Sequence, residues 1–175
     1  MKNWFLTFTF IITLGIIMNA QQVSNKNWTL VHERTATWCP FCGTWGWSMK
    51  DEIFKSYDDK NLIFMAVHHS GDLLNQTSNE FGSNFAGSGQ PIFYMDGDNL
   101  NVNSGNISAR IGDIKTAMDF KATQSVFAGV GVDATLNSNT KTLTAKAKVE
   151  FFEAVEAGDY YLGLYLLEDV LNIQA

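Results

Sequence analysis

The sequence has only two cysteines, no cluster of basic residues, and no apolar run long enough to span a membrane. A membrane-spanning helix needs about twenty apolar residues, whereas the apolar stretch at residues 4–18 has fifteen. The formal net charge is −6, and an acidic chain without a basic patch is a poor candidate for binding nucleic acid. No internal repeat or low-complexity linker is visible. These absences argue against a nucleic-acid-binding protein and against a repeat architecture.

The first twenty residues have the layout of an export signal. Lys2 supplies a positive start, residues 4–18 are mostly apolar, and Asn19-Ala20 offers a small-residue cleavage site. No cysteine follows this stretch closely, which argues against a lipoprotein anchor, and an uncleaved amino-terminal anchor is the alternative. Cleavage would leave about 155 residues with 11 basic and 18 acidic side chains, enough for one good core and a small appendage.

Both cysteines lie in the segment W-C-P-F-C at residues 38–42. Strand-forming residues at 29–35 precede it, and apolar residues at helical spacing over 40–57 follow it. The pair therefore lies at a predicted strand-to-helix junction, where the helix dipole would lower the pKa of the Cys39 thiol. A disulfide that closes so small a loop adds little stability to a fold. Redox chemistry is the favoured interpretation, and an inert structural disulfide is the alternative.

Strands and helices alternate up to about residue 123. The continuous apolar run at 62–68 predicts a strand covered on both faces. Residues 78–85 form a short predicted helix, and Asn106 is the expected N-cap of a last amphipathic helix. Between these helices we expect a hairpin whose strands are residues 92–95 and 100–102. The predicted order is β-α-β-α-β-β-α.

The pattern changes after residue 123. Apolar and polar residues alternate over 130–136 and 143–151, and residues 160–167 are predicted to be a third strand. Three antiparallel strands make a marginal sheet. We therefore expect residues 124–175 to be a truncated, partial antiparallel β-sandwich of immunoglobulin-like type, with the chain a piece of a longer protein.

The element order, with W-C-P-F-C opening the first helix, resembles the thioredoxin fold over roughly residues 27–123. Glu33, six residues before Cys39, and Pro91, which opens the third strand, match two further positions of that superfamily. The export signal and the β-rich continuation resemble, more narrowly, the thioredoxin-like outer-membrane proteins of Bacteroidota named after a twenty-eight-kilodalton member. The expected fold is therefore α/β, with a central mixed sheet flanked by helices in residues 21–123.

The resemblance implies a role for each residue near the cysteines. Cys39 would be the nucleophile that forms a mixed disulfide with substrate, and Cys42 would resolve it and leave a Cys39–Cys42 disulfide. Glu33, a carboxyl group in an apolar strand, would accept the proton of Cys42. The alternative for Glu33 is an exposed side chain paired with a neighbouring residue such as Arg34 or with solvent.

The resemblance also implies a substrate-binding edge. A cis bond before Pro91 would leave the Gln90 backbone free to pair with an extended peptide. Trp38 and Phe41 would form an apolar rim for unfolded polypeptide, whereas Trp45 and Trp47 are better explained by the core or the helix surface. A trans proline at the start of an ordinary strand is the alternative.

Two further groups resemble metal sites but are interpreted without a metal. His68 and His69 end the second strand, where solvated histidines are more common than a copper or zinc site. Residues 96–101 resemble a calcium loop faintly, but Leu100 stands at a ligand position and no glutamate closes the loop. We predict a turn there, and neither a metal nor a cofactor.

The leading hypothesis is an exported thiol–disulfide oxidoreductase acting on cysteine-containing exported proteins, with an unidentified partner that recycles it. No histidine lies between the cysteines to stabilise the thiolate, which favours a reductase or isomerase over a strong oxidant. The expected location is the periplasm, outer membrane or cell surface of a Gram-negative bacterium. The competing hypothesis is a non-catalytic structural or recognition module associated with the outer membrane.

Overall fold

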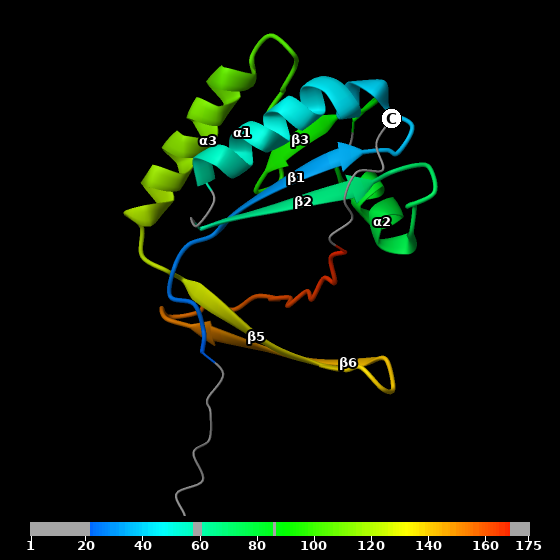
Figure 1. Cartoon of the computed structure of the whole chain (residues 1–175). Helices are drawn as coiled ribbons and strands as arrows, with labels where there is room; N and C mark the ends of the chain where they lie inside the picture. Colours follow the sequence, from blue (N-terminus) through cyan, green and yellow to red (C-terminus); the bar gives the residue numbers. More distant parts are fainter. Residues whose placement is uncertain (1–21, 58–60, 86, 169–175) are drawn as a thin grey trace, which may run out of the picture.

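The computed structural model describes residues 22–57, 61–85 and 87–168, and the predicted export signal lies outside these ranges. Its larger sheet has four strands in the order β2-β1-β3-β4. The central strand β1 runs parallel to β2 and antiparallel to β3 (Figure 1). The four strands are β1 Thr29–Thr35, β2 Leu62–His68, β3 Ile92–Met95 and β4 Asp98–Asn99. The mixed sheet predicted from the sequence is confirmed.

Helices cover both faces of this sheet (Figure 1). On one face lie α1 (Trp47–Tyr57) and α3 (Ile107–Ala122), and α2 (Gln76–Asn84) lies on the other. A π-helical turn, Cys42–Gly46, leads directly into α1. The core lies between β1, β3, α1 and α3, and its fully buried side chains are Val31, Met49, Ile53, Phe93 and Ile114. Helices on both faces were expected and are confirmed.

One helix starts earlier than predicted, and another starts as predicted but lacks the expected side-chain cap. Helix α2 begins two residues earlier than expected, because Asn75 and Ser78 form a capping box: Asn75 Oδ1 accepts from the Ser78 amide at 3.0 Å. Asn106 precedes α3, but its side chain does not cap that helix. Asn106 Oδ1 instead accepts from the Asn103 amide, and its Nδ2 donates to the Asn101 carbonyl. The polar side chains of this region hold the loop before α3.

The hairpin after β3 is tighter than predicted, and the expected strand at residues 100–102 is wrong. Asp96 and Gly97 both have positive φ, 50° and 100°, which is the backbone of a two-residue hairpin turn. Strand β4 therefore pairs at Asp98–Asn99. The Asp96 carboxylate accepts from the Leu30 amide and pairs with Lys121. Residues 96–101 thus form the predicted turn, with Asp96 bound by protein groups.

A separate two-stranded sheet follows, formed by β5 (Ala128–Asn137) and β6 (Thr142–Phe151). The register pairs Val130 with Val149 and Leu136 with Leu143, so apolar residues gather on one face. The third strand predicted at residues 160–167 is wrong: this segment forms no strand. Bends, and not a hairpin turn, connect β6 to this segment. The ring of Tyr165 packs edge-on against that of Phe81 in α2, with the ring centroids 5.7 Å apart.

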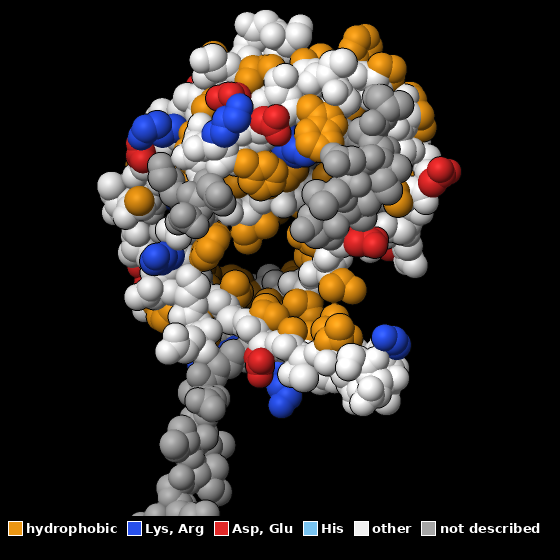
Figure 2. Space-filling model, viewed as in Figure 1, with side chains coloured by type: hydrophobic (Ala, Val, Ile, Leu, Met, Phe, Trp, Pro, Cys, Tyr) orange, Lys and Arg blue, Asp and Glu red, His pale blue; other side chains and the backbone are white. Residues whose placement is uncertain are grey.

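The apolar face of the β5–β6 ribbon is open. Val132, Leu136 and Leu143 are 57%, 64% and 44% exposed, so no closed core of its own surrounds this face within the described residues. Figure 2 shows hydrophobic side chains around the hollow between the ribbon and the larger sheet. In the described residues the expected β-sandwich is thus represented by two strands.

We predict that Ile114→Ala destabilises the fold by about 2–4 kcal/mol, because the side chain is 0% exposed in the core and its loss leaves a cavity. Urea unfolding followed by circular dichroism measures the change. Phe120→Ala is the matched control on the same helix, since Phe120 is 64% exposed, and it should change stability by less than about 0.5 kcal/mol. Equal losses in both variants would contradict this description of the core.

Candidate functional site

Cys39 and Cys42 form a disulfide at the amino-terminal end of the helical segment. The predicted pairing is thus confirmed. Both cysteines are buried, with Cys42 0% and Cys39 2% exposed. Ala36 completes the buried cluster around the bond.

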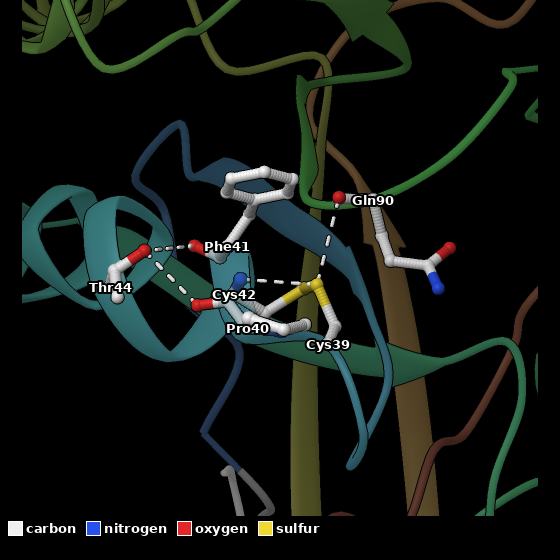
Figure 3. The surroundings of a disulfide bond; sticks show 6 residues. All are labelled: Cys39, Pro40, Phe41, Cys42, Thr44 and Gln90. Atoms are coloured by element: carbon white, nitrogen blue, oxygen red, sulfur yellow. Dashed lines mark hydrogen bonds between the residues drawn. A yellow bond between two sulfur atoms is a disulfide. The ribbon is translucent and has the colours of Figure 1, made fainter.

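The backbone at the disulfide directs one hydrogen-bond donor, the Cys42 amide, towards Cys39 (Figure 3). The amide of Cys42 lies 3.1 Å from Cys39 Sγ. An amide donor and the positive end of a helix both stabilise a thiolate, so they would lower the pKa of the Cys39 thiol once the disulfide is reduced. The Thr44 hydroxyl donates to the carbonyls of Pro40 and Phe41 at 3.0 and 3.3 Å. It thereby holds the first turn around the disulfide.

Gly46 brings the helix into contact with two other site residues. A Cβ atom at this position would lie 3.2 Å from Glu33 Oε1 and 3.2 Å from Pro91 Cγ. Gly46 is the last residue of the π-helical turn that starts at Cys42, and π-helical turns are often found at functional sites. Sequence reasoning missed both features. The available signal was a glycine inside a helical pattern, which costs about 1 kcal/mol relative to alanine and therefore needs a packing reason.

Glu33 is buried beneath this turn and is 3% exposed. Burial raises the pKa of its carboxyl group to about 8, against the opposing effects of a hydrogen bond from Thr35 and the positive charge of Lys50. Glu33 Oε1 has no hydrogen-bond partner among the described residues. The alternative of an exposed, paired glutamate is therefore wrong. Because side chains alternate along β1, Arg34 points to the opposite face of the sheet.

The start of β3 lies against the disulfide. The Gln90–Pro91 peptide bond is cis, as predicted, and Pro91 is buried. The Gln90 carbonyl oxygen lies 3.6 Å from Cys39 Sγ (Figure 3). The structure thus brings together Cys39, Gln90 and, through Gly46, the pair Glu33 and Pro91.

Two aromatic side chains beside the cysteines are open to solvent. Trp38 is 57% exposed and Phe41 is 63% exposed, as an apolar rim requires. Trp45 instead packs against the core, with its ring 6.3 Å from that of Phe93. Trp47 lies half-buried on the helix, with the Lys50 ammonium over its ring. The four aromatic residues therefore divide as the sequence predicted.

His68 and His69 lie beside the site without forming a ligand set. Among the described residues, no group of three or more histidine, cysteine or acidic side chains could hold a metal ion. His69 packs against α2, where a Cβ at Gly82 would lie 2.7 Å from its Nδ1.

None of the described helices is long and apolar enough to cross a membrane.

No family model matches this chain, and no curated protein or solved structure matches it.

We predict that Lys50→Gln raises the pKa of Glu33 further above about 8, because the ammonium charge favours the ionised carboxylate. Carbon-13 NMR of the glutamate carboxyl groups across a pH titration measures this shift. Lys55→Gln is the matched control on the same helix, since Lys55 is exposed and pairs with Glu52. An unchanged Glu33 titration in Lys50→Gln would contradict the electrostatic contact.

Proposed function

We propose that this chain is an exported thiol–disulfide oxidoreductase of the thioredoxin-like class that acts on protein disulfides as a reductase or isomerase. The proposal is based on the arrangement of groups around the disulfide. A disulfide at a helix start lies against the Gln90 carbonyl, and a buried carboxyl group lies under the same helical turn. A disulfide that only held the fold together would need neither feature.

The first step starts from the reduced protein. The Cys39 thiolate attacks one sulfur of a substrate disulfide, a new sulfur–sulfur bond forms to Cys39, and the other substrate sulfur leaves as a thiolate. The Cys42 amide, 3.1 Å from Cys39 Sγ, favours the thiolate that this attack needs. The product is a mixed disulfide between Cys39 and the substrate.

The second step releases the substrate. Cys42 gives its proton to the Glu33 carboxylate and attacks Cys39 Sγ, and the second substrate sulfur leaves as a thiolate. Two electrons pass from the cysteine pair to the substrate, and the pair ends as the disulfide that the structure contains. Since the Glu33 pKa is about 8, only about a tenth of its carboxyl groups are ionised at pH 7. Proton acceptance would therefore accelerate as the pH rises towards 8.

The surroundings of Cys39 favour an extended polypeptide as substrate. Trp38 and Phe41 offer exposed apolar surface, and the Gln90 backbone at the disulfide could pair with a peptide strand. Cysteine-containing exported proteins are the proposed substrates, and a separate redox partner would reduce the disulfide after each turnover. Residues 1–20 and the narrower resemblance support the periplasm, outer membrane or cell surface of a Gram-negative bacterium as the location.

The competing function is a non-catalytic recognition module at the outer membrane. The open apolar face of the β5–β6 ribbon favours it, because such faces often mark interaction sites. Both functions can be tested with the same cysteine variants.

We predict that the protein catalyses the reduction of insulin by dithiothreitol and that Cys39→Ser reduces the rate to the uncatalysed background. Cys42→Ser should instead trap a mixed disulfide with a peptide disulfide substrate, because the attacking thiol remains and the resolving thiol is gone. Turbidity measures the first reaction, and mass spectrometry measures the second. Equal insulin activity in wild type and Cys39→Ser would overturn the enzymatic function, and trapping by Cys39→Ser instead of Cys42→Ser would reverse the two roles.

We predict that Glu33→Gln slows resolution of the mixed disulfide by about a hundredfold or more, since a general base typically contributes about 10²–10⁴-fold. The wild-type rate should rise with pH towards a pKa near 8, whereas the variant rate should follow the ionisation of the Cys42 thiol itself. Stopped-flow measurement of substrate release at pH 6 to 9 gives both rates. A variant that keeps the wild-type pH profile would show that Glu33 is not the proton acceptor.

A further inference from the structure

Helix α2 is held against the sheet by an aromatic cage around His32. This histidine lies on β1 and is 1% exposed. Its ring stacks on Tyr94 of β3 at 4.7 Å with an interplanar angle of 10°. Phe81 of α2 and Phe85, the C-cap residue of this helix, pack edge-on against the imidazole. Their ring centroids lie 5.6 and 4.5 Å from that of His32. His32 is therefore the centre of the contact between α2 and the sheet.

The imidazole has no polar partner in this cage. Neither Nδ1 nor Nε2 of His32 has a hydrogen-bond partner among the described residues. The titratable groups that face it are Tyr94 from β3 and His69, which follows β2. Arg34, two residues along β1, acts electrostatically on Tyr94 and His69. Helix α2 contributes only the two phenylalanine rings. Among the described residues no carboxylate faces His32 to balance a positive charge.

The same cage is connected to the disulfide. The Tyr94 hydroxyl donates to the carbonyl of Phe85, at the end of α2, at 3.4 Å. A Cβ atom at Gly87 would lie 2.3 Å from Ile92 Cδ1, so Gly87 packs tightly against β3. The chain from Gly87 leads to Gln90, whose carbonyl oxygen is 3.6 Å from Cys39 Sγ. A displacement of α2 would therefore be transmitted to the substrate-binding edge.

We propose that His32 is a pH-sensitive latch: an imidazole that takes up a proton releases α2 from the sheet and displaces Gln90 from the disulfide. The release of α2 follows from the cage alone. Its consequence, a slower disulfide exchange in acid, rests on the proposed function of the Cys39 site.

The direction of the pH effect on the closed state follows from the burial of the imidazole. Burial, with a smaller contribution from His69, lowers the pKa of His32 from 6.5 to about 4 in the closed structure. Aromatic rings attract a cation, but here the loss of hydration outweighs that attraction. The closed state is therefore fully favoured above pH 6.5 and loses stability as the pH falls towards 4. The open state should gain about tenfold in population for each pH unit in this window.

Hydrogen exchange of the full chain tests the latch directly. After correction for intrinsic exchange rates, the amides of residues 76–85 should be roughly ten- to thirtyfold less protected at pH 5 than at pH 7. His32→Phe keeps an aromatic ring in the cage without a titratable group, and it should remove most of this difference. His69 also packs against α2 and burial lowers its pKa to about 4, so His69→Gln measures its own share of the difference, which should be smaller because His69 is only half-buried whereas His32 is 1% exposed. Equal protection at both pH values in wild type would overturn the proposal, as would a pH dependence that His69→Gln removes and His32→Phe keeps.

A second variant keeps the test valid if His32→Phe does not fold. His32→Leu also removes the titratable group, and far-ultraviolet circular dichroism at pH 7 shows which variant is folded. Insulin reduction at pH 5 and 7 then separates the two proposals. Acid-sensitive exchange in a protein without oxidoreductase activity would support the latch and refute the proposed function. Acid-insensitive exchange in an active enzyme would refute the latch alone.

Discussion

Successive side chains of β1 point to opposite faces of the sheet, which gives Glu33 and His32 different surroundings. Strand β1 is hydrogen-bonded on both edges, to β2 and to β3, so its residues cannot rotate between faces. Glu33 therefore lies on the face covered by the Cys42–Gly46 turn, and His32 lies on the face covered by α2. A register shift of one residue would exchange the two environments. One strand thus supplies both the carboxyl group beneath the disulfide and the imidazole behind it.

Burial of two titratable groups on one strand opposes stability, and their pKa values move in opposite directions. Glu33 stays protonated up to about pH 8, and His32 stays neutral down to about pH 4. Between these values both groups are mostly uncharged, so the sheet holds them without ion pairs. Only the ionised fraction of Glu33 can accept a proton, and this fraction grows as the pH rises towards 8, but its raised pKa makes that carboxylate a stronger base than one of ordinary pKa.

Features set by local sequence were predictable, and those set by packing were not. The disulfide was predicted from the spacing of Cys39 and Cys42, whereas the cis bond at Pro91 was predicted only from a resemblance to the thioredoxin fold. Alternation alone could not say which face of β1 points inward, so the environment of Glu33 stayed open. The strand predicted at residues 160–167 failed because apolar residues do not specify a hydrogen-bonded partner. The second strand of the hairpin was predicted at residues 100–102 instead of Asp98–Asn99, because its position depends on the positive φ of Asp96.

The first residues of β5 are held by the segment that precedes β1. The amide of Ser24, which precedes β1, donates to the Val130 carbonyl at 3.1 Å. A Cβ atom at Gly129 would lie 2.0 Å from the Ser24 carbonyl oxygen, so only glycine permits this close approach. Asn27 then ties the same segment to the end of α3, by donating to the Lys121 carbonyl at 3.0 Å. Two strands alone are marginally stable in water. The segment before β1 therefore anchors the ribbon, and it continues directly into the strand that carries Glu33 and His32.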